Sequence, residues 1–435
     1  MRPQIPEPFC SASTKASFLS VALFAFLIAC VGQLANAQTY SVIHTFTNAP
    51  DGAVPYAGLT IDDAGNLYGT TSLGGYVGTA VCNEGCGTVF KMAHTESGWT
   101  NAILYAFRPL PFDGVIPSSR VIFGPDGALY GNTYEGGAYY LGTVFRLTPP
   151  SNPCNTAPCP WKESFYSFTP DYLHGAGPIA DVVFDRNGNL YGTTVLGGTE
   201  TCERSPNACG VVYEIAAPVQ QWQESVIHNY MQSTGSQPYA GIIFDNSGNI
   251  FGVTTAGGTD DEGTVYEMTQ SGGSWTYNVL YNFTAQNDGS RPDGNLIQDA
   301  SGDLYGTTAL AGSGGGGTVF ELSPSGGGWT FSVIHSFTGT EGPVDALTMD
   351  AGGNLYGTTY KDGAYGFGNV FKLSPSNGSW VYTSLYDFTG GADGGNPLSN
   401  VTMDSAGNLY GTAAYGGSDR RLCGGGCGVV WEITP

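Results

Sequence analysis

Short runs of alternating hydrophobic and polar residues recur along most of this chain, separated by turns rich in Gly, Asp and Asn. Such runs are typical of β-strands joined by tight hairpins, and no helical period interrupts them. One stretch shows four successive runs, at residues 241–245, 249–254, 263–268 and 275–283. The turn between the first two, Asp245 to Gly248, has the Asp and Gly of a tight turn. The pattern predicts an all-β protein.

The same unit of four runs occurs seven times. Its core, Gly-Asn-Leu-Tyr-Gly-Thr, stands at residues 65–70, 188–193, 353–358 and 407–412, with looser copies at 127–132, 248–253 and 302–307. Successive copies lie 51 to 62 residues apart. A strand-rich repeat of about 50 residues is typical of propeller blades. We therefore predict a single seven-bladed β-propeller of four-stranded blades over residues 38 to 435.

The two ends of the repeat region predict how the ring of blades closes. The last unit stops after its third strand, at residues 428–434. The missing fourth-strand pattern stands instead at Thr39 to Phe46, which matches Thr276 to Phe283. We expect the N-terminal strand to complete the last blade, because this pairs an edge that would otherwise be exposed.

The N-terminus resembles a targeting segment. A basic start precedes an apolar run at residues 16–31 and a small-residue cleavage signature at 35–37, which predicts a signal peptide over residues 1–37. A lipobox-like sequence ending at Cys30 leaves open a lipid-anchored form. No second hydrophobic stretch follows, so we expect no transmembrane segment in the mature chain. The predicted location is secreted, either extracellular or periplasmic.

The cysteines agree with export. Beyond Cys10 and Cys30, eight cysteines stand in four close pairs, and an even number in an exported chain predicts disulfides. Each would close a short loop and contribute about 2 kcal/mol, so they would clasp loops rather than create the fold. The pairs are Cys82 with Cys86, Cys154 with Cys159, Cys202 with Cys209, and Cys423 with Cys427.

Composition narrows the range of partners. The formal net charge is −22, and such a surface repels phosphate backbones, which argues against nucleic acid as a partner. A hydrophobic content of 41% is too high for a disordered chain. We expect a monomer.

The repeat unit resembles a known family. With its Gly-Asn-Leu-Tyr-Gly-Thr-Thr core, a following Gly-Gly and a Gly-Thr-Val-Phe strand, it is similar to the GloVer (Gloeo-Verruco) tandem repeat of bacterial exported proteins, over residues 38 to 435. The resemblance implies no assigned activity, and there are no family catalytic residues to carry over. The Asp-x-x-Gly-Asn-Leu-Tyr core is more loosely similar to the propeller repeats of NHL proteins and streptogramin lyases.

Residues that occur in every unit are most simply explained by packing. Six of the seven tryptophans open the fourth strand of successive units. His44, His228 and His335 share one fourth-strand position with a tyrosine in the other units. We interpret this position as a half-buried aromatic site, so function is expected where the units differ.

Two sets of loops are expected on one face: the connecting loops, from the fourth strand of one blade to the first strand of the next, and the hairpin loops, from second to third strand. Five connecting loops carry an acidic residue followed by Gly. These residues would form a collar suited to calcium, unless Asp-Gly is ordinary turn chemistry here. They are Asp51, Asp113, Asp288, Glu341 and Asp393.

The hairpin loops carry aromatic side chains beside acids and amides. Aromatic faces stack on sugar rings while polar groups bind hydroxyls, so these loops are candidates for glycan binding. The alternative is that the loop aromatics pack on neighbouring loops. The candidate residues are Tyr76, Tyr139, Tyr140, Tyr365, Tyr415 and Arg420.

Enzyme signatures are scarce in this sequence. No nucleophile elbow, zinc-protease motif or phosphate-binding glycine loop occurs. His174, in a connecting loop, is the one candidate general base. We therefore expect a non-enzymatic binding or scaffold propeller for a glycan or surface protein, without a certain cofactor but with calcium as the candidate. The alternatives are a metal-assisted lyase or hydrolase, and a purely structural surface protein.

Overall fold

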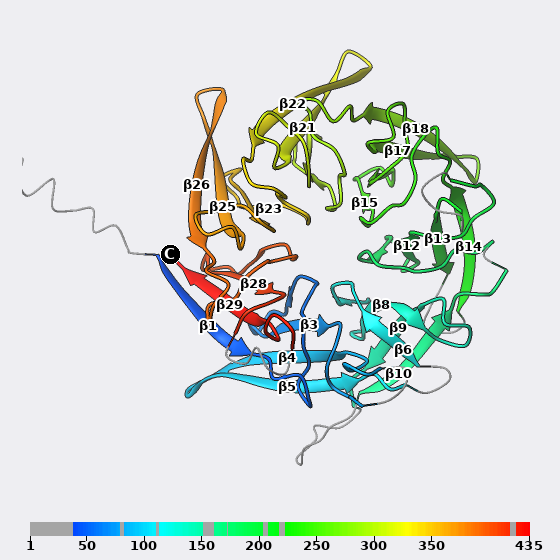
Figure 1. Cartoon of the computed structure of the whole chain (residues 1–435). Coiled ribbons are helices and arrows are strands. Elements are labelled where there is room, and N and C mark those ends of the chain that lie inside the picture. The colour runs from blue at the N-terminus through cyan, green and yellow to red at the C-terminus, as the bar shows by residue number, and fades with distance from the viewer. Residues whose placement is uncertain are drawn as a thin grey trace, which may run out of the picture. The chain divides into compact units, whose positions relative to one another are not determined.

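The computed structural model describes residues 38–78, 82–109, 113–150, 161–171, 173–202, 208–216, 222–417 and 423–435. Tyr40–Thr434 form one compact unit, and none of the described residues belongs to a helix. Seven antiparallel sheets stand as blades around a central axis (Figure 1). The predicted all-β, seven-bladed propeller is confirmed. No helix long and apolar enough to cross a lipid bilayer occurs in the described ranges.

Each blade is a meander whose first strand lies nearest the axis and whose fourth lies outermost (Figure 1). Blades one to three contain β2 (Thr60–Ile61), β3 (Leu67–Thr71), β4 (Thr88–Thr95) and β5 (Gly98–Ala106); β6 (Gly114–Pro117), β7 (Ile122–Phe123), β8 (Leu129–Gly136), β9 (Thr143–Thr148) and β10 (Lys162–Ser167); and β11 (Val183–Phe184), β12 (Leu190–Thr194), β13 (Val211–Ala216) and β14 (Gln223–Asn229). Blades four to seven contain β15 (Ile243–Phe244), β16 (Ile250–Thr254), β17 (Thr264–Ser271) and β18 (Ser274–Asn282); β19 (Ile297–Gln298), β20 (Leu304–Thr308), β21 (Thr318–Ser325) and β22 (Gly328–Ser336); β23 (Thr348–Met349), β24 (Leu355–Thr359), β25 (Asn369–Ser376) and β26 (Ser379–Asp387); and β27 (Thr402–Met403), β28 (Leu409–Ala413), β29 (Val429–Thr434) and β1 (Thr39–Thr45).

The N-terminal strand closes the ring as predicted. The last sheet has the order β1-β29-β28-β27, so β1 is its outermost strand. Just after β1, the amide of Phe46 donates to the carbonyl of Gly428 at 3.0 Å. On the inner side, Thr412 Oγ1 of blade seven donates to the carbonyl of Ala57 in blade one at 3.1 Å. Both the outer and the inner edges of the last blade are therefore tied into the ring.

The repeated Asp-x-x-Gly-Asn-Leu-Tyr core forms a closed hydrogen-bonded turn. Asp62 accepts from the amides of Ala64 at 3.0 Å and Asn66 at 2.8 Å, and from the hydroxyl of Tyr68 at 3.0 Å. Asp350 and Asp404 repeat this arrangement. The most recognisable motif of the sequence is therefore structural, because its carboxylate is used within its own turn.

Blade two departs from the predicted four strands. There, β6 adds to the second strand through the pairs Gly114 with Gly136 and Pro117 with Thr133. Other blades have a single bridge at this place, such as Ala53 with Leu73 in blade one. The fifth strand is a lengthened form of that bridge.

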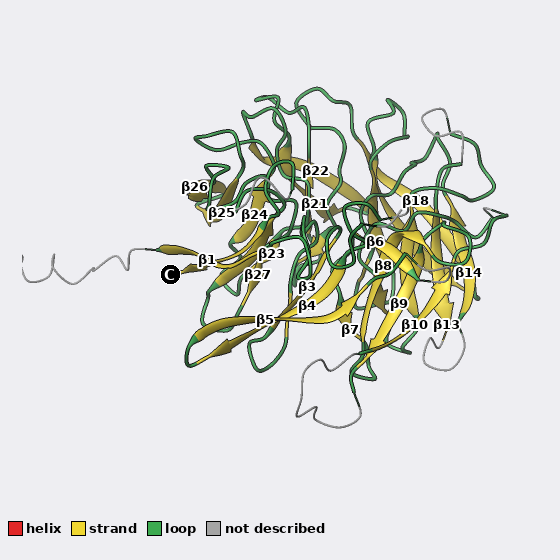
Figure 2. Ribbon diagram, turned by 60° about the horizontal axis from the view of Figure 1, so that its bottom comes forward, coloured by secondary structure: helices red, strands yellow, loops and turns green. Residues whose placement is uncertain are grey.

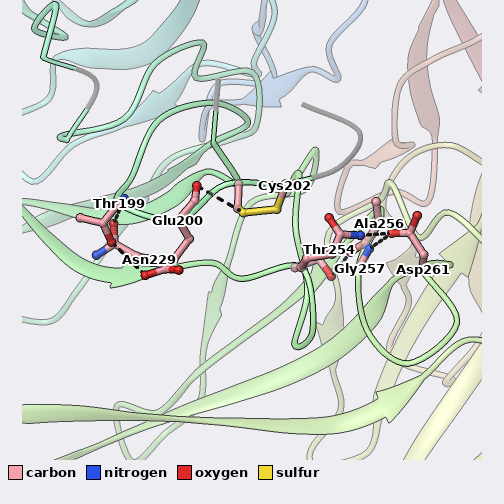
Figure 3. The surroundings of a disulfide bond; sticks show 10 residues. Thr199, Glu200, Cys202, Asn229, Thr254, Ala256, Gly257 and Asp261 are labelled. Atoms are coloured by element: carbon pink, nitrogen blue, oxygen red, sulfur yellow. Dashed lines mark hydrogen bonds between the residues drawn. A yellow bond between two sulfur atoms is a disulfide. The ribbon is translucent and has the colours of Figure 1, made fainter. Parts of the chain in front are cut away.

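Three of the four predicted disulfides are present, and all three lie in hairpin loops. They join Cys82 to Cys86, Cys202 to Cys209 and Cys423 to Cys427, with Cα atoms 5.1 to 5.3 Å apart. Figure 3 shows Cys202 close to Thr199, whose amide donates to Asn229 Oδ1 at 3.0 Å. Cys154 and Cys159, the predicted leader 1–37 and Cys30 lie outside the described residues.

The glycine of the Leu-Tyr-Gly-Thr core makes room for an aromatic ring. A Cβ atom on Gly306 would lie 2.4 Å from Phe320 Cζ and 2.8 Å from Leu296 Cδ2. The equivalent Gly69, Gly192 and Gly411 meet a third-strand aromatic at 2.3 to 2.6 Å. That aromatic in turn packs edge-on against an aromatic residue just after the fourth strand of the preceding blade, as Phe320 of blade five does on Phe283 of blade four, with ring centroids 5.3 Å apart. The glycine of one blade thus makes room for a pair of rings that joins two neighbouring blades.

The fourth strands meet at one repeated position. Here a ring of one blade stacks on a ring of the next at four junctions, with centroids 3.6 to 4.4 Å apart and planes within 7°. These pairs are Tyr40 with Tyr386, His228 with Tyr277, Tyr281 with Phe331, and His335 with Tyr382. The interpretation of this histidine position as a half-buried aromatic site agrees with these stacks.

The other three junctions use hydrogen bonds at the same position. Tyr105 donates to Glu163 Oε2 at 2.8 Å and lies 3.1 Å from Asp113 Oδ2. The remaining oxygens, Glu163 Oε1 and Asp113 Oδ1, are buried without a hydrogen-bond partner in the described structure. Burial and the charge of Asp113 raise the pKa of Glu163 to about 8. A proton held between the two carboxyl groups satisfies both oxygens.

We expect Gly306→Ala to destabilise the propeller by about 1–3 kcal/mol, because the methyl group overpacks against the ring of Phe320. Urea unfolding measures this loss. Gly328→Ala in the same blade is the matched control, since its nearest atom would lie 3.8 Å away. Adding Phe320→Leu to Gly306→Ala should restore part of the loss. Equal effects of the two glycine substitutions would contradict the packing explanation.

We expect the free energy of unfolding of the wild type to fall as the pH rises from about 4.5 to about 8, relative to that of Glu163→Gln. The folded state holds the proton of Glu163 more tightly than the unfolded chain, so stability is lost as this proton leaves, by roughly 2–4 kcal/mol. The Gln amide replaces the shared proton and does not titrate.

Chemical unfolding at several pH values measures this difference, with Glu96→Gln at an exposed turn as the control. Parallel pH profiles for the wild type and Glu163→Gln would show that the carboxyl pair shares no proton.

Candidate functional site

The connecting loops and the hairpin loops lie on one face of the propeller, which we call the loop face (Figure 2). The opposite face carries the short turns between first and second strands and the hairpins between third and fourth strands. A cavity of about 440 Å³ opens at the axis and is lined by residues from all seven blades. We call it the central cavity.

One repeated position supplies much of the lining of the central cavity. Each connecting loop ends in a proline, and the next residue faces the cavity just before the first strand begins. The proline fixes the backbone before the strand, so the same register recurs in every blade. The seven lining residues are Tyr56, Ser118, Ile179, Tyr239, Asp293, Val344 and Leu398.

Three carboxylates of this cavity have basic partners. Asp181 lies 3.2 Å from Arg120 Nε, and Asp293 lies 3.4 Å from Arg291. Glu341 lies 3.0 Å from Lys361 Nζ. Asn295 connects blade five to blades four and three, because its side-chain oxygen accepts from the amide of Gly241 and its Nδ2 lies 3.4 Å from Asp181.

A fourth carboxylate, Asp345, is bound differently. Its oxygens accept from the amides of Ala346 at 2.6 Å and Asn400 at 2.7 Å. None of the ion pairs found among the described residues includes it. Burial and the charge of Asp181 raise the pKa of Asp345 to about 7, and burial raises that of Asp293 to about 6. Burial therefore disfavours the charged forms of these two carboxyl groups.

Four of the five acids predicted to form a collar serve their own loops instead. Asp288 accepts from the amide of Thr284 at 2.8 Å and from the hydroxyl of Tyr281 at 3.0 Å. Asp393 does the same with Thr389 and Tyr386. Asp51 and Asp113 take equivalent positions, with His44 and Tyr105 as the fourth-strand partners. The turn explanation thus describes these four residues.

Glu341 is the one member of the predicted collar that lines the central cavity. The five acids are not gathered around one point: within the described ranges no group of three His, Cys, Asp or Glu side chains is placed to hold a metal ion. The reason is that the turn bonds direct the Asp side chains toward the fourth strands.

The tyrosines predicted to bind a glycan are exposed but dispersed. Tyr76, Tyr139, Tyr140 and Tyr365 are 51% to 61% exposed in the hairpin loops of blades one, two and six. Arg108 lies over the ring of Tyr76 at 5.6 Å. Tyr415 is partly buried and lines a smaller cavity of about 270 Å³ with Tyr56. Arg420 lies outside the described residues.

His174 lies at the junction of blades two and three, and it does not line the central cavity. Its Nδ1 lies 2.5 Å from Glu224 Oε2, and Glu224 also accepts from Tyr166 at 3.4 Å. Glu224 takes the place of a stacking ring at this junction. The histidine therefore partners a buried carboxyl group between two blades.

Sequence reasoning missed most of the cavity residues, including Tyr56, Tyr239, Asp293 and Asp345. A signal for them exists in the repeat itself. The residue after the repeated proline differs chemically from unit to unit, whereas the residues of the following second strand hardly change. Variation at a fixed register inside a repeat marks a position that packing leaves free.

Comparisons with known proteins give a family and a fold. A profile of the Gloeobacter/Verrucomicrobia repeat matches residues 30–202 and 199–431. No curated protein matches the chain. Among solved structures, the extracellular domain of BT4673 from B. thetaiotaomicron is 11% identical, with TM-scores of 0.55 and 0.54 in two structures. These alignments cover 91% and 90% of this chain, which spans 40% and 39% of the BT4673 chains.

A protein of unknown function from Dyadobacter fermentans is 11% identical, with 92% of this chain and 98% of that chain covered and a TM-score of 0.46. At such identities the likeness to BT4673 shows the propeller fold alone. The profile match, in contrast, extends over nearly all of the repeat region, as the motifs of the unit predicted. The chain belongs to the Gloeobacter/Verrucomicrobia repeat family.

Proposed function

We propose that this protein is an exported binding module that holds a glycan in the central cavity of the loop face. The observation that carries this proposal is the lining: all seven blades contribute to one cavity, and they do so with chemically different residues on an otherwise repeated frame. A volume of about 440 Å³ lies within the range of small-ligand sites, which is about 300–1,000 Å³.

The chemistry of the lining suits a sugar. Tyr56 and Tyr239 are 36% and 43% exposed, so their rings offer open faces on which a sugar ring can stack. Asn295, Asp293 and Glu341 offer oxygen and nitrogen atoms for hydroxyl groups. Aliphatic residues such as Ile179 and Leu398 complete the wall and exclude water from the stacked face.

Export is supported by features independent of the cavity. Three disulfides close hairpin loops on the loop face, and disulfides persist in oxidising compartments outside the cytosol. The signal-peptide pattern of residues 1–37 points the same way.

We expect the mature chain, residues 38 to 435, to bind selected members of a polysaccharide and oligosaccharide panel, and Tyr239→Ala to weaken that binding about 3- to 10-fold. The loss follows from removal of a stacking ring at the cavity. Titration calorimetry on the panel members that bind measures it.

Tyr139→Ala is the matched control, because Tyr139 is equally open but lies in a hairpin loop and does not line the cavity. The panel is run with calcium and again with chelator, and we expect the same affinity in both, since the described residues gather no metal-binding group. Absence of binding to every glycan would remove the proposal, and loss through Tyr139→Ala alone would move the site to the hairpin loops.

A further inference from the structure

The charges around the central cavity are not evenly matched. Four carboxyl groups line it: Asp181, Asp293, Glu341 and Asp345. The first three each have a basic side chain within 3.4 Å, as described above. Asp345 has two backbone amides but no ion pair among the described residues. Asp345 is therefore the one carboxyl group of this lining without an ion-pair partner among the described residues.

The nearest basic groups are each paired with another carboxylate. Arg120 is committed to Asp181, to which its backbone amide also donates at 2.8 Å. Arg291 and Lys361 lie on Asp293 and Glu341. Moving any of them onto Asp345 would leave another carboxylate of the cavity unpaired, which costs as much as it relieves.

The surroundings of Asp345 define the shape of what would pair with it. Val344, Ile179 and Leu398 line the same cavity and give it an apolar wall. The rings of Tyr56 and Tyr239 stand at positions equivalent to Val344 in other blades. A ligand that fits has an apolar ring face and a single cationic group, rather than a bare metal ion, which would need several converging oxygen ligands.

We infer that the central cavity selects a glycan bearing a free, protonated amino group, with the ammonium paired to Asp345 and the sugar ring stacked on the tyrosines. This rests on the proposed function and names its ligand class: an amino sugar without an acetyl group. An ammonium donates three hydrogen bonds, so it can pair with Asp345 and still donate to a second oxygen of the lining. Acetylation removes the positive charge that would pair with Asp345.

The test compares three disaccharides of the same linkage on the wild-type mature chain near neutral pH: cellobiose, the corresponding glucosamine disaccharide, and its N-acetylated form. We expect the glucosamine disaccharide to bind at least about tenfold more tightly than either of the others, because a charge-assisted hydrogen bond forms out of water. Titration calorimetry gives the three affinities.

Two variants locate the effect. Asp345→Asn should abolish the preference for the amine while leaving affinity for cellobiose within about twofold. Glu341→Gln removes one negative charge from the same cavity but from a carboxylate that already has Lys361, so it should keep the preference. Tyr239→Ala should weaken all three sugars alike. Thermal unfolding shows whether Asp345→Asn is folded, and the wild-type comparison stands without it.

The outcomes separate this inference from the proposed function. Equal affinity for the charged and neutral sugars overturns the inference and leaves the glycan module in place. A preference that survives in Asp345→Asn also overturns it, because the amine then pairs elsewhere. Failure of the wild type to bind any sugar of the broad panel removes both.

Discussion

The structure depends on an edge-to-face contact between two aromatic rings of adjacent blades, one in the third strand of a blade and one just after the fourth strand of the blade before it. Phe90 with Phe46, Phe145 with Phe107 and Trp431 with Phe388 show this contact at three of the junctions. These rings are almost fully buried, and the absence of a side chain on the second-strand glycine leaves room for the third-strand ring. Buried leucines and valines surround the rings, so the core between two blades combines aromatic and aliphatic packing.

The fourth strands of adjacent blades meet through more varied contacts. At four junctions the outer strands stack ring on ring, whereas at three they exchange hydrogen bonds through Asn101, Glu163 or Glu224. The polar junctions cluster around blades one to three, where the first of them also joins the last blade to the first. Two of these polar junctions have a buried carboxyl group, Glu163 or Glu224, where other junctions have an aromatic ring. Hydrogen bonds to that carboxyl group replace the ring stack there.

The fold could be predicted because each strand, each turn and the strand that closes the ring has a recognisable short sequence pattern. Alternation marks the strands, Asp and Gly mark the turns, and Thr39 to Phe46 repeats the pattern of an absent fourth strand. The site was less accessible. Asp288 and Asp393 are of a type that binds cations, but each accepts from a tyrosine seven residues earlier in the chain. The residue types alone do not say whether such an Asp points toward this tyrosine or toward the axis. An Asp at the position of Asp345 occurs in one of the seven units. The sequence does not show which basic side chains lie near it, because those come from other parts of the chain.

The residue after each connecting-loop proline varies among the seven blades and faces the central cavity. It follows a proline that every unit shares, and of the seven residues Leu398 is the one that packs against a buried core cluster found in the described structure. Substitutions at these seven places change what the cavity presents while the scaffold stays the same. The repeated frame thus separates the residues that fix the fold from most of those that face the cavity, so that a change of ligand requires substitutions in the lining and leaves the blade cores as they are.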